Sequence, residues 1–130
     1  MATFLLDTSV IIDVLNNKRN RPNLLLEIVR AGHLLSCCPI NITEVYAGMR
    51  PKEESATEEF FAGLQHFPIT SSAARLAGEL KRDYARKGTT LNLGDVIIAA
   101  VAIHYGLTLI TDNIKDFPMK NLAFEALPGT

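Results

Sequence analysis

The sequence predicts an α/β fold built from βαβ units around a parallel sheet. Short apolar runs rich in Leu and Ile alternate with longer segments of helical periodicity, which is the pattern of such units. The 130 residues fit one domain, and a domain of this size buries roughly two-thirds of its unfolded surface without covalent staples. We therefore expect a single domain over residues 1–130.

The apolar runs place the expected strands. They fall at residues 3–6, 34–38, 66–69 and 108–111, with a weaker strand at 122–126. Cys37 and Cys38 are adjacent at the end of the second strand, where neighbouring side chains point to opposite faces of a sheet. We interpret both as small core residues of a reducing compartment, without a disulfide.

Helices are expected between these strands. A short one follows Asp7, and the segment 23–31 has helical periodicity and ends at Gly32. Residues 41–48 begin another, and the acidic segment 51–59 leads to a helix with an apolar edge at Phe60, Phe61 and Leu64. The segment 72–87 is amphipathic. The segment 95–105 is apolar all round, which predicts a central, buried helix.

Charge and hydropathy narrow the class of protein. Lys and Arg total 13 against 14 Asp and Glu, and the net charge of −1 leaves any nucleic-acid contact to local patches. Lys18, Arg19 and Arg21 form one patch and residues 81–87 form another, although a solvated face more often explains such clusters. The N-terminal run lacks the basic stretch of a signal peptide, and the longest apolar run, 96–103, is too short to cross a bilayer. We expect a soluble cytoplasmic protein.

Three carboxylates stand where a parallel sheet would bring them together. Asp7 ends the first strand, while Glu44 and Asp95 lie at the starts of helices that follow strands. The carboxyl ends of strands line the binding crevice of an open parallel sheet. Carboxylates about 4 Å apart repel by roughly 4 kcal/mol at an effective dielectric of 20, so such a cluster requires a cation. Oxygen ligands without His or Cys favour Mg²⁺ or Mn²⁺ over zinc.

Each acidic position also has an ordinary structural explanation. Asn41 and Glu44 have the spacing of a capping box, in which Asn41 caps a helix and Glu44 reaches back to it. A carboxylate at a helix start, such as Asp95, is favoured by the helix dipole by about 0.3–1 kcal/mol. Asp112 and Asn113 suit a turn after the fourth strand. These separate explanations do not account for the fact that all of these acidic positions fall along one edge of the expected sheet.

Four segments, in this order and spacing, resemble one family. They are FLLDTSVIID at 4–13, NITEVYAG at 41–48, LGDVIIAA at 93–100 and TLITDN at 108–113. Together they resemble the PIN-domain nucleases, and among these the VapC toxins of type II toxin–antitoxin systems. The resemblance covers essentially the whole chain.

The resemblance implies a three-layer α/β/α sandwich and a metal-dependent endoribonuclease. It implies Asp7, Glu44 and Asp95 as the acidic core of the active site. Either Thr8 or Ser9 would hydrogen-bond into this site.

A fourth acid usually stands two residues after a threonine in this family. Thr111 is that threonine here, and Asn113 occupies the position of the acid, with Asp112 and Asp116 on either side. An asparagine can still bind a metal-bound water or a phosphate oxygen. We therefore expect activity with Asn113 as a site residue. We leave open whether one or two metal ions bind, and whether Asp112, Asn113 or Asp116 serves the fourth position.

The expected mechanism uses Mg²⁺ or Mn²⁺ held chiefly by Asp7 and Asp95. Glu44 would either bind the metal through water or orient the attacking water. Such a metal lowers the pKa of bound water and offsets charge on the phosphate during in-line displacement at an RNA phosphodiester. The resemblance implies a 5′-phosphate product.

The resemblance also implies partners, namely an RNA substrate, a small cognate antitoxin and a second copy of the chain in a homodimer. Phe60, Phe61 and Leu64 are candidates for apolar contact with a partner, unless they belong to the core.

Two alternative functions stay open. One is an RNA-binding or regulatory module that has lost turnover through Asn113. The other, a metal-dependent phosphatase with Asp7 as nucleophile, is disfavoured because Ser9 stands two residues on in place of a second acid.

Overall fold

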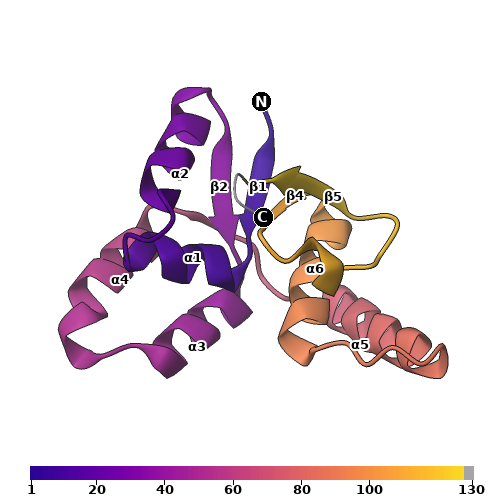
Figure 1. Cartoon of the computed structure of the whole chain (residues 1–130). Helices are drawn as coiled ribbons and strands as arrows, with labels where there is room; N and C mark the ends of the chain where they lie inside the picture. Colours follow the sequence, from indigo (N-terminus) through magenta and orange to yellow (C-terminus); the bar gives the residue numbers. More distant parts are fainter. Residues whose placement is uncertain (128–130) are drawn as a thin grey trace.

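The computed structural model describes residues 1–127, which form a five-stranded, all-parallel sheet with helices on both faces (Figure 1). The strands are β1 (Thr3–Leu6), β2 (Leu34–Cys37), β3 (Gln65–His66), β4 (Thr108–Thr111) and β5 (Ala123–Ala126). Their order across the sheet is β3-β2-β1-β4-β5, so the chain builds outward from β1 in one direction and then returns to its other side. This reversal makes the gap between the carboxyl ends of β1 and β4 the topological switch point, where ligands bind in open α/β sheets.

The helices alternate with the strands as the sequence predicts. They are α1 (Thr8–Leu15), α2 (Arg21–Arg30), α3 (Pro39–Gly48), α4 (Glu54–Ala62), α5 (Ser71–Arg86) and α6 (Leu93–Tyr105), with short 3-10 helices η1 (Pro51–Glu53) and η2 (Ile114–Asp116). One predicted strand is too long. The segment 66–69 forms a strand only over its first residue, and Phe67, just beyond β3, donates its N–H to the carbonyl of Cys37.

Alternate residues of β1 divide the interior into two cores. Leu5 packs with α5 and α6, whereas Phe4 and Leu6 pack on the other face with residues of α1, α2, α3 and α4. The sheet therefore forms the middle layer of a three-layer sandwich, as predicted. The expected buried helix is α6, in which residues 98–102 are at most 1% exposed.

The two cysteines confirm the predicted division of faces. Cys38 lies in the core beside α6, and Cys37 lies in the opposite core. Burial raises the pKa of Cys37 to about 12 and that of Cys38 to about 11, so both thiols stay protonated and unreactive.

Phe61 is also buried, with Phe60 and Leu64 packed around it, so these three side chains belong to the core. Within residues 1–127, no helix has both the length and the apolar character needed to cross a membrane.

Candidate active site

Asp7 lies at the switch point and is held there by both strands that meet. Its backbone N–H donates to the carbonyl of Ile110 on β4 at 2.9 Å, and its carboxylate caps α1 by accepting from the N–H of Thr8 at 2.8 Å. The hydroxyl of Thr111, the last residue of β4, donates to Oδ2 of Asp7 at 2.7 Å. Ser9 lies 3.4 Å from the same oxygen. These contacts bring Thr8, Ser9 and Thr111 together around the first acid.

Hydrogen bonds keep this buried carboxylate able to ionise. Burial raises the pKa of Asp7. The hydrogen bonds from Thr111, Thr8 and Ser9 act in the opposite direction, because each stabilises the charged form. The negative charge of Asp112 adds a smaller upward contribution to the pKa.

Glu44 is fixed by a chain of side-chain hydrogen bonds rather than by a capping box. The helix α3 begins at Pro39 with Cys38 as its cap, so Glu44 lies within the helix and the predicted capping box is wrong. Asn41 instead reaches back to the N–H of Cys38 and, fully buried, donates to the hydroxyl of Thr8 at 3.0 Å. Because that hydroxyl accepts from Asn41, its own proton is directed to Oε1 of Glu44, at 2.6 Å.

Gly94 explains how Glu44 reaches the start of α6. A Cβ added at this glycine would lie 2.6 Å from Oε2 of Glu44, closer than real Cβ contacts allow. Because Gly94 has no side chain, the carboxylate of Glu44 on α3 can approach the first turn of α6. Asn92 caps α6 by accepting from the N–H of Asp95 at 3.3 Å, which places Asp95 in that same turn.

Asp95 lies close enough to the other acids for their charges to raise its pKa. Burial and the negative charges of Asp7, Asp116 and Glu44, in that order, raise it from 3.8 to about 6. The structure thus brings together Asp7, Glu44 and Asp95, which lie far apart in the sequence. Asp116, at the end of η2, joins them.

Asn113 is anchored beside this cluster through its backbone. Its N–H donates to the hydroxyl of Thr111 at 2.9 Å, and it precedes η2, which ends at Asp116. Of the acids flanking Asn113, Asp116 acts on Asp95, whereas Asp112 acts on Asp7. A direct role of the Asn113 side chain stays a prediction.

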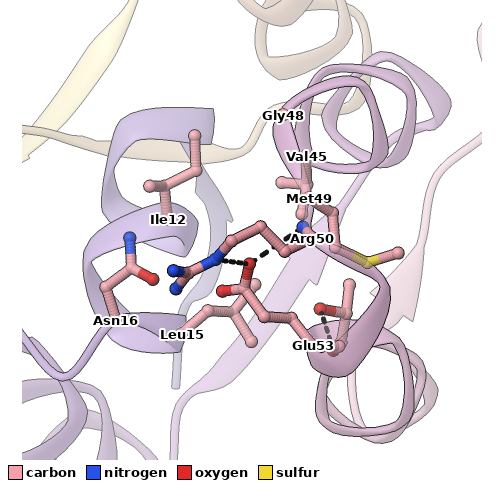
Figure 2. A pocket seen from close by; sticks show the side chains of 9 residues that line it. Ile12, Leu15, Asn16, Val45, Gly48, Met49, Arg50 and Glu53 are labelled. Carbon is pink, nitrogen blue, oxygen red and sulfur yellow. Dashed lines mark hydrogen bonds and ion pairs between the residues drawn. The ribbon is translucent and has the colours of Figure 1, made fainter.

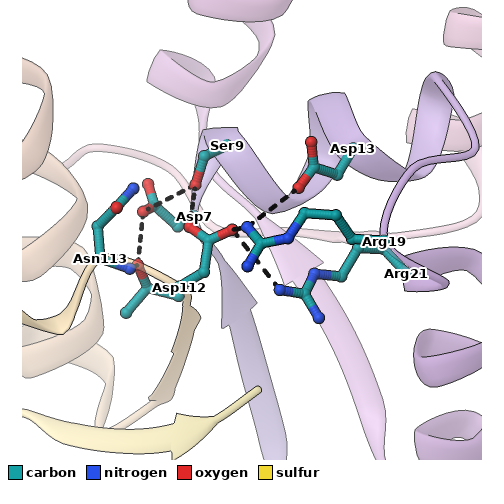
Figure 3. A network of polar contacts seen from close by, with 8 residues as sticks. Asp7, Ser9, Asp13, Arg19, Arg21, Asp112 and Asn113 are labelled. Atoms are coloured by element: carbon teal, nitrogen blue, oxygen red, sulfur yellow. Dashed lines mark hydrogen bonds and ion pairs between the residues drawn. The ribbon is translucent and has the colours of Figure 1, made fainter. Parts of the chain in front are cut away.

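Asp112 links the acidic cluster to two arginines (Figure 3). Its Oδ1 accepts from the hydroxyl of Ser9 at 3.1 Å, and its Oδ2 accepts from Nη1 of Arg19 at 2.8 Å. Nη2 of Arg21 lies 3.8 Å from Oδ2, and Nη1 of Arg19 lies 3.8 Å from Oδ2 of Asp13. The expected solvated patch at 18–21 is therefore wrong for Arg21, which is fully buried.

Residues 4–124 match the PIN domain family model. The chain belongs to this family. It is 32% identical over 115 residues to ribonuclease VapC19 of Mycobacterium tuberculosis, an alignment that covers 88% of this chain and 92% of that protein.

Solved structures confirm the three-layer fold. Rickettsia felis VapBC2 bound to a DNA fragment from its promoter matches with a TM-score of 0.84 at 23% identity, covering 96% of this chain and 98% of that one. DNA-bound VapBC from Salmonella typhimurium matches with a TM-score of 0.80 at 25% identity, covering 97% and 98%.

The donor set of this PIN domain fits a hard divalent cation held by few protein ligands. Within residues 1–127, no group of three His, Cys, Asp or Glu side chains has the arrangement of a protein-only metal site. Mg²⁺ characteristically binds through one or two carboxylates, several waters and substrate phosphates. Asp7 and Asp95, with Glu44 and Asp116 close enough to affect Asp95, supply the oxygen donors for that mode of binding.

A separate groove of about 270 Å³ lies at the other end of α1 (Figure 2). Its walls come from α1, α3, η1 and α4, and the lining residues include Ile12, Leu15, Val45 and Met49. Arg50 and Glu53 form an ion pair of 2.9 Å at this groove. The same helix, α1, therefore carries Thr8 in the acidic site and an apolar wall of the groove.

Proposed function

We propose that this PIN domain is a VapC-type endoribonuclease, the toxin of a type II toxin–antitoxin module, and that it requires Mg²⁺ or Mn²⁺. The carrying observation is that Asp7 at the end of β1, Glu44 from α3 and the first turn of α6, which holds Asp95, meet at the switch point. Burial and the charges of Asp7, Asp116 and Glu44 raise the pKa of Asp95 to about 6, in agreement with this arrangement. Acids from separate elements that repel one another at a switch point indicate a functional site, and a cation would relieve the repulsion. The ribonuclease name of the VapC19 relative supports the reaction class.

Asp7 and Asp95 are the residues that would hold the metal. A divalent cation bound there supplies a water of lowered pKa and offsets charge on the scissile phosphate. The hydroxyls of Thr111 and Ser9 favour the charged form of Asp7 that a cation needs. Glu44, directed by Thr8 and seated over Gly94, would orient the attacking water or accept its proton.

The groove at the far end of α1 is the site at which we propose that an antitoxin binds. The similar solved structures from Rickettsia felis and Salmonella typhimurium are those of VapBC, which supports such a partner. Ile12 is 39% exposed beside the apolar lining of this groove, so it offers contact to a partner. The homodimer and the cytoplasmic location stay predictions.

RNA cleavage tests the proposed function. Purified protein should cleave a mixed RNA pool with Mn²⁺ or Mg²⁺ and lose this activity in EDTA. Asp95→Asn and Asp116→Asn should each reduce cleavage at least about a hundredfold, because each removes a charge from the site. Asn113→Asp should preserve or raise cleavage, since it adds a carboxylate at the position where the family usually has one.

The outcomes separate the alternatives. RNA binding without cleavage by the wild-type protein would favour the regulatory module. Hydrolysis of a phosphomonoester instead of RNA would favour the phosphatase, although both carboxylate oxygens of Asp7 accept hydrogen bonds and Ser9 stands where a second acid would be needed. Full activity of Asp95→Asn would refute the assignment of the site.

A further inference from the structure

Arg19 stands at the rim of the acidic cluster and is connected to it through Asp112. We propose that Arg19 binds a backbone phosphate of the RNA substrate, and that Asp112 and Asp13 hold its guanidinium in place until the phosphate displaces them. This inference rests on the proposed ribonuclease function. It also chooses between the two basic segments, 18–21 and 81–87, as the path of the RNA backbone.

The first argument is position. Nη1 of Arg19 donates to Oδ2 of Asp112, whose Oδ1 accepts from Ser9, and Ser9 lies 3.4 Å from Oδ2 of Asp7. The guanidinium is thus connected through two intervening side chains to the acid that we assign to the metal. This position at the rim of the acidic cluster suits a group that binds a backbone phosphate of a strand held at Asp7.

The second argument is exposure. The Arg19 side chain is 44% exposed, so a ligand can reach it, whereas the side chain of Asp112 is only 6% exposed. Arginine recognises phosphate through several N–H donors in one plane, and its charge-assisted hydrogen bonds are stronger than neutral ones. A phosphate can therefore replace the Asp112 carboxylate with a ligand of the same chemistry.

The third argument is that Asp112 keeps a counter-charge when Arg19 moves. A buried carboxylate that loses its only cation is strongly destabilised. Arg21 is fully buried with Nη2 at 3.8 Å from Oδ2 of Asp112, so one cation stays beside that acid. The two arginines therefore have different roles, with Arg21 structural and Arg19 exchangeable.

The backbone of the loop between α1 and α2 also indicates function. Asn17, Arg19 and Asn20 have φ values of 52°, 55° and 58°, in the left-handed region. Asparagine adopts this region more readily than other non-glycine residues do, so Arg19 is the unusual one of the three. Such conformations persist where surrounding contacts hold them, and they cluster at ligand-binding sites. Here the strained loop presents Arg19 to Asp112.

The other basic segment is less suited to this role. Lys81 donates to the carbonyl of Leu91, Arg82 pairs with Asp83 on the same helix at 3.1 Å, and Lys87 lies 5.4 Å from the ring centroid of Tyr84. None of these contacts joins α5 to the acids of the site. The charge that offsets repulsion between RNA and the carboxylates therefore comes from the α1–α2 loop.

The test is steady-state RNA cleavage with Mn²⁺ at several salt concentrations. Arg19→Ala should raise KM about tenfold with kcat nearly unchanged. It should also weaken the dependence of KM on salt concentration by the amount expected for the loss of about one phosphate contact. Arg19→Lys should restore part of the loss, since it keeps the charge without the planar fork. The matched control is Arg30→Ala, which removes an exposed arginine from the last residue of α2 and should leave KM unchanged.

A double-mutant cycle tests the exchange itself. Asp13→Asn weakens the hold on Arg19 without touching Arg21, so it should lower KM about two- to threefold, and this effect should vanish in the Arg19→Ala background. The proposal is overturned if Arg19→Ala behaves like Arg30→Ala, or if it lowers kcat and melting temperature with KM unchanged. A wild-type protein that binds but does not cut RNA refutes the nuclease function alone. In that case the Arg19→Ala and Arg30→Ala variants are compared by their Kd for RNA in place of KM. A wild-type protein that does not bind RNA refutes both.

Discussion

Replacing Asp95 by asparagine should stabilise the metal-free protein while abolishing cleavage. Partial burial of the carboxylate, and then the negative charges of Asp7, Asp116 and Glu44, raise its pKa to about 6. An asparagine has nearly the same shape without the charge. The variant therefore removes repulsion from the metal-free fold and removes a metal ligand from the site.

The magnitude follows from the pKa. A difference of one pKa unit corresponds to about 1.4 kcal/mol, and the pKa of Asp95 rises from 3.8 to about 6. The whole difference would be roughly 3 kcal/mol, but solvent screening at a partly exposed carboxylate reduces it, and we expect about 1–2 kcal/mol. For a chain of this size the melting temperature should rise by roughly 3–8 °C.

The effect should depend on pH with a definite sign. Because the folded protein binds the Asp95 proton more tightly than the unfolded chain does, metal-free wild type should gain stability as pH falls from about 6 to about 4. The raised pKa of Asp7 acts in the same direction. A cation binds only the charged site, so Mn²⁺ should stabilise wild type more at pH 7.5 than at pH 5.5. This dependence on Mn²⁺ should be mostly absent in Asp95→Asn.

Thermal melts followed by circular dichroism, in EDTA and in saturating Mn²⁺ at both pH values, measure these effects. Asp83→Asn is the matched control, because Asp83 is an exposed acid on α5 away from the cluster. If Asp95→Asn is less stable than wild type at pH 7.5 in EDTA, the carboxylate stabilises α6 through the helix dipole. The repulsion argument would then be wrong.

Two further variants test how Glu44 is positioned. Gly94→Ala should lower cleavage at least about tenfold with a change in stability below roughly 1 kcal/mol, because its Cβ would displace the end of the Glu44 side chain while alanine favours the helix. Asn41→Ala should destabilise the protein by about 1–3 kcal/mol in urea titrations, since it leaves the hydroxyl of Thr8 and the carbonyl of Leu6 without this donor. Thr43→Ala, an exposed change on α3, is the control for the second experiment, and equal midpoints for the two would contradict the role of Asn41.

The sheet and the gathering of the acids could be predicted because they follow from local patterns. Apolar runs ending in a polar residue place Asp7 and Thr111 at strand ends, and parallel topology brings strand ends to one edge. The start of α3 could not be predicted in the same way. Asn41 and Glu44 fit a capping box, but Asn41 is recruited by the end of β1, and that contact depends on tertiary packing.

Long-range ion pairs explain the other errors and omissions. Arg19 and Asp112 are 93 residues apart, and nothing local to either residue indicates that they meet. The interpretation of residues 18–21 as a solvated patch therefore missed the burial of Arg21. Asp116 was named only as an alternative, because its approach to Asp95 depends on the turn that η2 makes after β4.

The two acids assigned to the metal are stabilised differently, and this difference bears on function. Asp7 is fixed between two strands and receives hydroxyl donors that favour its charged form. Asp95 lies in the first turn of a helix, where burial and the charges of its acidic neighbours raise its pKa. Repulsion in the metal-free state is thus concentrated on Asp95, and a cation gains most from relieving it there. Metal affinity should therefore fall steeply below pH 6, as Asp95 takes up its proton, while Asp7 stays in place at the strand end.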